Sequence, residues 1–118
     1  YKTAAVSNKY DDAVQILTQK FFKGLIDAAS GESLEIRRKP HSDGIIKVIG
    51  ILGSKLDNVI YAGDSEVDIK TAENINAPCI SVLWGFKSKD FLQKFGGRIF
   101  AEKPSDILDI LSSFAAKV

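Results

Sequence analysis

The sequence predicts an α/β fold in which short, mostly parallel strands alternate with helices. Short apolar runs typical of buried strands alternate with segments whose apolar residues recur at helical spacing. Polar residues directly follow several of the apolar runs, which is where open parallel sheets place ligand-binding side chains. The 118 residues make room for one ordinary globular domain but not for two.

The predicted elements alternate from one end of the chain to the other. The expected strands are Thr3 to Val6, Leu25 to Ala29, Val59 to Ala62, Cys79 to Leu83 and Arg98 to Ala101. The expected helices are Asp11 to Phe22, Ser42 to Leu52, Val67 to Ile75, Ser88 to Phe95 and Pro104 to Ala115. We expect a turn at Ser30 to Ser33, and we expect Gly53 to end the helix before it.

Charge and cysteine content exclude several classes of partner. Sixteen Lys and Arg against fifteen Asp and Glu leave a net charge of +1, so we expect neither nucleic acid nor an anionic membrane as the main partner. The single Cys79 cannot form an internal disulfide, and no long apolar run or secretory signal is visible. These features predict a cytoplasmic location.

Gly63, Asp64 and Ser65 follow an apolar strand at the point where a helix begins. Gly63 permits a tight turn, and Asp68 lies one helical turn beyond Asp64, so the two carboxylates could address one hard cation such as Mg²⁺. The alternative is structural: Asp64 or Ser65 caps the helix, while Glu66 and Asp68 favour its positive end. Spacing alone leaves both interpretations open.

Two other polar groups suit an anion. Ser7 and Asn8 follow the first strand and offer a hydroxyl, an amide and backbone N–H groups for phosphate oxygens, although such residues also form ordinary turns. Lys39 before Pro40 supplies a compact cation, although Lys-Pro is also common in loops. Trp84, Gly85 and Phe86 after the fourth strand could line the site or fill the core, and we favour the core.

The order of these segments resembles that of haloacid dehalogenase superfamily phosphatases of the phosphoglycolate phosphatase type. The matching segments are Lys2–Lys9 (KTAAVSNK), Arg38–Pro40 (RKP), Tyr61–Ile69 (YAGDSEVDI), Pro78–Phe86 (PCISVLWGF) and Ala101–Leu111. The resemblance covers nearly the whole chain. It implies a three-layer, Rossmann-like core with a mostly parallel sheet, and it implies that residues 1–118 are the C-terminal part of such a core domain.

The resemblance also implies roles for the polar residues. Ser7, helped by Asn8, would bind the transferring phosphoryl group, Lys39 would neutralise it, and Asp64 with Asp68 would hold catalytic Mg²⁺ directly or through its water shell. The implied activity is hydrolysis of a small phosphorylated metabolite, with 2-phosphoglycolate as the expected substrate and pyrophosphate as a close alternative.

One motif of the family is missing from the sequence. The family's nucleophile is the first Asp of a DxDx(T/V) motif on the central first strand, and no such motif occurs here. We therefore expect that strand, and the cap that selects substrate, to lie upstream of Tyr1, so that the chain alone is inactive. The loss would leave unpaired strand edges open to self-association.

Two alternatives to a phosphatase use the same residues. The chain could be a non-catalytic fragment or a phosphate-binding or assembly module, which would bind or associate without turnover. A receiver-type signalling domain would also place Ser7, Lys39 and Asp64 in this order. It would need an acidic cluster on its first strand, and that cluster is missing.

Overall fold

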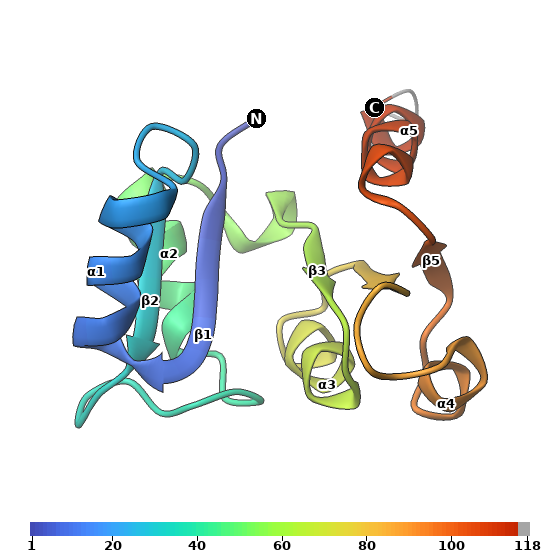
Figure 1. Ribbon diagram of the computed structural model, residues 1–118, viewed down its shortest axis with the longest axis horizontal. Helices are drawn as coiled ribbons and strands as arrows, with labels where there is room; N and C mark the ends of the chain where they lie inside the picture. Colours follow the sequence, from blue (N-terminus) through green and yellow to red (C-terminus); the bar gives the residue numbers. More distant parts are fainter. Residues whose placement is uncertain (116–118) are drawn as a thin grey trace. The chain divides into compact units, whose positions relative to one another are not determined.

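The computed structural model describes residues 1–115, which form two compact units that meet in sequence between Val59 and Ile60, each with its own small parallel sheet. In each unit, strands alternate with helices in chain order (Figure 1). The predicted α/β fold with parallel strands is confirmed. None of the helices within these residues is long and apolar enough to cross a membrane.

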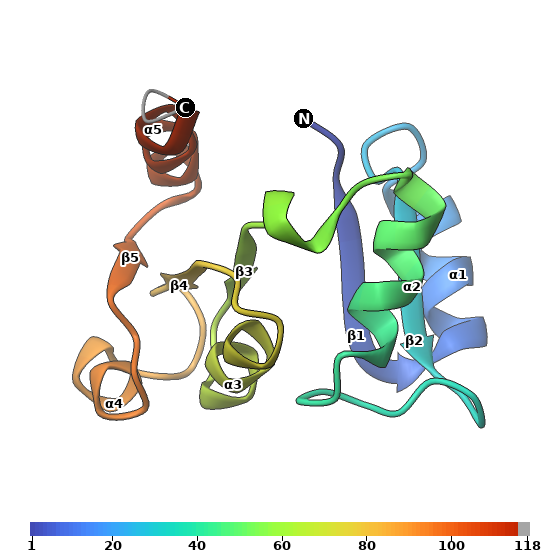
Figure 2. The ribbon, with the colours of Figure 1, turned by 180° about the vertical axis from the view of Figure 1, so that it is seen from behind.

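The first unit consists of two parallel strands between two helices. Its elements are β1 (Ala4–Tyr10), α1 (Asp11–Phe21), β2 (Ala28–Glu32), α2 (Asp43–Leu52) and a 3₁₀ turn η1 (Leu56–Asn58). Gly31 of β2 lies against Val14 of α1, whereas its neighbour Ser30 lies near Gly44 of α2. Successive residues of a strand face opposite ways, so the two helices cover opposite faces of the sheet, as the view from behind also shows (Figure 2).

The first two strands differ from their predicted bounds. Regular pairing of β1 stops at Val6, where the strand was expected to end, but β1 continues to Tyr10, which pairs with Glu32 after an irregularity in register. β2 runs through Ser30 and Gly31, where a turn was predicted, and both residues are buried. The turn prediction was wrong because the close approach of helices from both sides selects small residues here, and small residues also favour turns.

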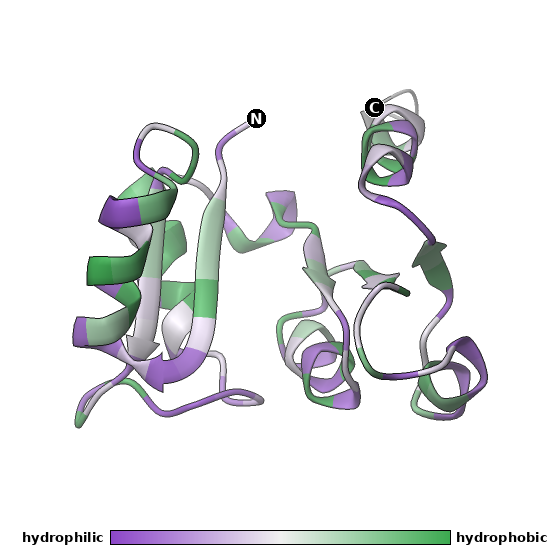
Figure 3. Cartoon of the chain, in the orientation of Figure 1, coloured by the Kyte–Doolittle hydropathy of each residue, from purple (hydrophilic) through white to green (hydrophobic). Residues whose placement is uncertain are grey.

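The second unit has three parallel strands in the order β3-β4-β5. Its elements are β3 (Tyr61–Gly63), α3 (Glu66–Asn74), β4 (Cys79–Val82), α4 (Lys89–Lys94), β5 (Ile99–Ala101) and α5 (Pro104–Ala115). Ile80 and Val82 form a buried cluster with Ala101, against which Ile107 and Ile110 of α5 pack. Figure 3 shows β5 as a hydrophobic strand, consistent with its place in this cluster.

Several predicted helix ends are confirmed in detail. Gly53 ends α2 in the left-handed conformation with φ 67°, a backbone geometry that glycine adopts without strain. Ser88 caps α4 by accepting a hydrogen bond from Phe91 N at 3.1 Å. Pro104 is the first residue of α5, where its missing N–H has no intrahelical partner to lose.

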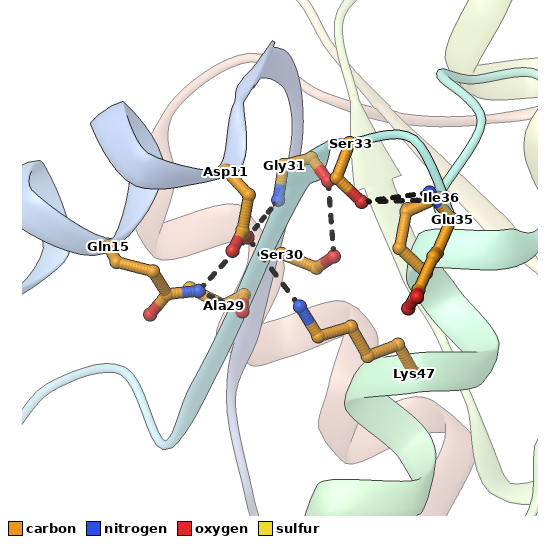
Figure 4. Close-up of polar contacts among 9 residues, drawn as sticks. All are labelled: Asp11, Gln15, Ala29, Ser30, Gly31, Ser33, Glu35, Ile36 and Lys47. Carbon is orange, nitrogen blue, oxygen red and sulfur yellow. Dashed lines mark hydrogen bonds and ion pairs between the residues drawn. The ribbon is translucent and has the colours of Figure 1, made fainter.

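Asp11 at the start of α1 ties the first unit together (Figure 4). Its Oδ1 accepts hydrogen bonds from Gly31 N at 2.9 Å and from Gln15 Nε2 at 3.2 Å, and it lies 3.6 Å from Lys47 Nζ of α2. These contacts join both helices to β2. The Gly31 N–H, with Gln15 and Lys47, lowers the pKa of the Asp11 carboxyl.

Replacing Asp11 with Ala should therefore reduce the free energy of unfolding by about 1–3 kcal/mol, because the Gly31 N–H loses its acceptor. Chemical denaturation followed by circular dichroism measures the loss. Asp12, which is exposed and occupies the same helical turn, provides the matched control, and Asp12→Ala should change stability far less. Equal losses from the two variants would contradict the role given to Asp11.

Candidate functional site

The turn between β3 and α3 carries the predicted acidic pair. Asp64 directly follows β3 and is exposed, whereas Asp68 lies in the first turn of α3 and is only 5% exposed. A carboxylate this buried needs hydrogen-bond donors to stay ionised. The groups that donate hydrogen bonds to Asp68 therefore determine whether its carboxylate is available to a ligand.

Asp68 accepts hydrogen bonds from three residues in its own neighbourhood. Its Oδ2 accepts from Asp64 N at 2.9 Å, from Ser65 N at 3.2 Å and from Ser65 Oγ at 3.1 Å. Its Oδ1 accepts from the Tyr61 hydroxyl at 2.9 Å. Gly63 makes room for this arrangement, because a Cβ at that position would overlap the Asp68 carboxylate. The result is a turn whose backbone is fixed by one buried side chain.

The alternative role for this turn, capping the following helix, applies to two of its residues, Ser65 and Asp68. Ser65 is the N-cap of α3 and forms a reciprocal capping box with Asp68. Asp64 gives only its backbone N–H to the cap, and its carboxylate stays at the surface. Of the two predicted metal ligands, Asp64 thus has the accessible carboxylate, while Asp68 holds the turn.

Burial beside Asp68 also perturbs two groups on the adjoining strands. Tyr61 pairs in register with Cys79, the first residue of β4. Desolvation, with the Asp68 charge and hydrogen bond, raises the pKa of the Tyr61 hydroxyl above its ordinary value, so it remains a donor. Desolvation, again with the Asp68 charge, raises the pKa of the Cys79 thiol to about 11.

The predicted phosphate-binding residues meet in the first unit. Ser7 and Asn8 lie in the irregular part of β1, and Asn8 Oδ1 accepts a hydrogen bond from Lys39 N at 2.7 Å. Ser7 Oγ accepts from Lys9 N at 3.2 Å. Lys39 is half-buried and is followed by a cis peptide bond to Pro40. The backbone of Lys39 is thereby held against the Asn8 amide, next to Ser7 in the chain.

An ion pair anchors the loop that carries Lys39. Arg37 Nε and Nη2 donate to the two oxygens of Asp43 at 2.9 and 3.0 Å, and Arg37 N donates to Oδ2 at 2.9 Å. Asp43 is the first residue of α2, so the bidentate pair fixes the loop to the helix start. The Arg37 side-chain and backbone hydrogen bonds lower the pKa of Asp43 to about 2.

The site residues fall into two groups, one in each unit. Ser7, Asn8 and Lys39 belong to the first unit, and Asp64 and Asp68 belong to the second. In the described part of the chain, no three His, Cys, Asp or Glu side chains gather into a metal site by themselves.

The loop after β4 differs from its prediction. Trp84 is 49% exposed and Phe86 is fully exposed, so the expectation that both fill the core was wrong. Gly85, the third residue that the sequence indicated as a possible lining of the site, does lie against the Asp64 carboxylate, whereas the Tyr61 hydrogen bond to Asp68 was not predicted. Tyr61 and Gly63 are two residues apart on β3, which places both on one face; this spacing was the signal available for Tyr61.

These motifs, on an α/β fold with parallel strands, place the chain in a known family. The profile of the haloacid dehalogenase-like hydrolases matches residues 1–82, and the chain belongs to this family. Pyrophosphatase PpaX of Bacillus cereus (strain AH820) is 26% identical over 95% of this chain and 52% of its own length. The chain spans about half the length of the curated relatives it matches.

Solved structures agree with this assignment. A protein from Lactobacillus delbrueckii subsp. bulgaricus, described as a "putative phosphoglycolate phosphatase", is 43% identical with a TM-score of 0.87, over 90% of this chain and 44% of that chain. The haloacid dehalogenase-like protein SP0104 from Streptococcus pneumoniae has a TM-score of 0.82 over 94% of this chain and 52% of that chain. At 20% identity, the second similarity shows the fold alone.

The Arg37–Asp43 ion pair should make the stability of the fold depend on pH at low pH. Replacing Arg37 with Ala should raise the pKa of Asp43 from about 2 toward its ordinary 3.8, measured by NMR titration of the side-chain carboxyl carbon. Because the folded pKa is the lower one, the pair stabilises the fold above pH 3.8 and loses this effect as the pH falls through 2. Arg38→Ala, at the next position, should leave the titration unchanged; an unshifted curve for Arg37→Ala would contradict the assignment.

Proposed function

We propose that this chain supplies the phosphate-binding and metal-binding residues of a Mg²⁺-dependent phosphomonoester hydrolase that acts on a small phosphorylated metabolite. The observation that carries the proposal is the 2.7 Å hydrogen bond from Lys39 N to Asn8 Oδ1, which joins two phosphate-binding candidates across 31 residues. The favoured substrate is 2-phosphoglycolate, supported by the 43% identity to a protein described as its phosphatase. Pyrophosphate, named for the Bacillus cereus relative, is the alternative.

In this proposal the first unit binds the phosphoryl group. The Ser7 hydroxyl and the backbone at Asn8 donate hydrogen bonds to phosphoryl oxygens. The Lys39 ammonium neutralises their charge, and the Asn8 amide holds the backbone from which that ammonium extends. Preorganised donors and a fixed cation stabilise the charge of the transferring group without reorganising during the reaction.

The second unit is proposed to hold Mg²⁺. The donor chemistry fits, because Asp64 has an exposed carboxylate and a hydrated Mg²⁺ needs only one or two carboxylates beside a substrate phosphate. Asp68 would act by fixing the backbone of Asp64. When bound, the ion would reduce the repulsion between phosphate oxygens and an incoming carboxylate.

The nucleophile is proposed to come from a segment outside these 118 residues. The sequence has no DxDx(T/V) motif, and the chain spans about half the length of its relatives. The outside Asp would attack phosphorus, forming an acyl phosphate as the ester P–O bond breaks and the leaving oxygen takes a proton from a neighbouring acid. Water would then release phosphate and restore the carboxylate. Residues 1–118 would thus be the C-terminal part of a hydrolase core domain.

A second candidate function is non-catalytic assembly. Among the described residues, β1 pairs only with β2, and β3 pairs only with β4, so each keeps one strand edge without a ladder partner. An unpaired edge accepts a strand from another chain or segment. This role predicts association without turnover, and the catalytic proposal predicts turnover only once the nucleophile is present.

The phosphate site can be tested in the 118-residue chain. Titration with inorganic phosphate, followed by amide NMR, should shift the resonances of Ser7, Asn8 and Lys39. Lys39→Ala should weaken this binding about tenfold, because the bound anion loses its cation. Lys55→Ala, which removes an exposed lysine of the same unit, is the control and should bind as the unmodified chain does. Phosphate shifts confined to other residues would overturn the site.

The metal role of Asp64 can be tested in a longer protein that includes the nucleophile. Asp64→Asn should reduce Mg²⁺-dependent hydrolysis by a factor of about 100 or more, because the ligand charge is lost. Asp90→Asn, an exposed carboxylate of the same unit, is the control. Assays with 2-phosphoglycolate and pyrophosphate, each followed by phosphate release, distinguish the two substrates. Unchanged turnover in Asp64→Asn would remove this residue from the metal site.

A further inference from the structure

The loop after β4 meets the exposed acidic residue of the neighbouring turn. A Cβ placed on Gly85 would lie 2.5 Å from Asp64 Oδ2, 3.0 Å from its Cγ and 2.8 Å from its Cβ. Separations this short do not occur between real side chains, so the Asp64 side chain packs directly on the Gly85 backbone. The glycine thereby forms one wall beside the Asp64 carboxylate.

The loop is attached on both sides of this contact. Before it, Leu83 N donates to Ala101 O of β5 at 2.9 Å. After it, Lys87 Nζ lies 3.9 Å from Glu66 Oε2 at the start of α3 and 4.8 Å above the Phe91 ring of α4. These attachments hold Gly85 beside the turn that carries Asp64.

Burial of apolar side chains does not explain the position of this loop. Trp84 and Phe86, the residues on either side of Gly85, are 49% and fully exposed. Neither large side chain is buried, while the residue without a side chain lies against Asp64. We expect this arrangement if the loop's role is to pack against the Asp64 carboxylate rather than to bury apolar side chains in the core.

We infer that Gly85 is a positioning residue for metal binding by Asp64, an inference that rests on the metal role proposed above. An exposed Asp side chain samples several rotamers, and the Gly85 backbone restricts the space open to this one. Restricting a ligand before the metal arrives lowers the conformational cost of binding.

A methyl group at position 85 would disturb this arrangement in a way that rotation cannot relieve. Turning the Asp64 carboxylate away would remove the contact with Oδ2 but not the contact with Cβ, which the backbone fixes. The backbone of Asp64 is itself held by the hydrogen bond from its N–H to Asp68. Gly85→Ala should therefore push the loop away from the turn and release the carboxylate.

The packing can be tested without metal. In the unmodified 118-residue chain, NMR should show a nuclear Overhauser effect between the Asp64 β protons and the Gly85 α protons. Its absence would overturn the inference whatever the behaviour of the variants. This measurement keeps the test decisive even if Gly85→Ala does not fold.

The functional consequence can be tested with Mn²⁺ as a probe for Mg²⁺. Paramagnetic broadening of the Asp64 and Ser65 amide resonances during a titration gives the affinity. Gly85→Ala should weaken Mn²⁺ binding about tenfold, within the range seen when groups that orient metal ligands are changed. Gly50→Ala is the matched control, because a Cβ there meets nothing within 4 Å. Thermal unfolding of each variant confirms that the fold is retained.

The outcomes separate this inference from the proposed function. Loss of binding in Asp64→Asn together with unchanged binding in Gly85→Ala would overturn the positioning role and leave the metal site standing. Absence of broadening at Asp64 in the unmodified chain would overturn both. Weakened binding in Gly85→Ala, with normal binding in Gly50→Ala, is the result expected.

Discussion

The buried carboxylate of Asp68 is the interaction on which the second unit's candidate site depends. It is almost inaccessible to water, and donors from Asp64, Ser65 and Tyr61 take the place of hydration. One side chain thereby starts α3, sets the turn after β3 and determines where the Asp64 backbone lies. Asp11 does comparable work in the first unit, where it joins two helices to a strand. In both units an acidic residue at a helix start organises the adjoining strand.

Much of the fold could be predicted from the sequence because its signals are local. Helical periodicity and the ends marked by Gly53, Ser88 and Pro104 are properties of a few adjacent residues. The failure at Ser30 and Gly31 has a different origin. Those residues favour turns by themselves, and only the helices packed on both faces keep them in a strand. Such tertiary packing leaves no mark on the local pattern.

The sequence predicted which residues belong to the candidate site, but it could not predict which of them is buried and structural and which is exposed. Asp64 and Asp68 lie where the Gly-Asp-Ser spacing indicated, yet spacing could not tell which carboxylate would be buried. Likewise, the hydrogen bond between Asn8 and Lys39 joins segments far apart in the chain. The sequence indicated Gly85 only as one of three residues after β4 that could line the site, because its close contact with Asp64 depends on atomic separations between two loops.

The environment of Cys79 has a consequence for the chemical durability of the chain. With its pKa raised to about 11 by burial and by the Asp68 charge, about one thiol in ten thousand is ionised at neutral pH. The thiolate is the form that reacts with peroxides and alkylating agents. Burial at the start of β4, with the carboxylate that orders the turn, therefore keeps the chain's single cysteine in its less reactive thiol form. Slow oxidation of Cys79 is thus a side effect of the packing that buries the start of β4 beside Asp68.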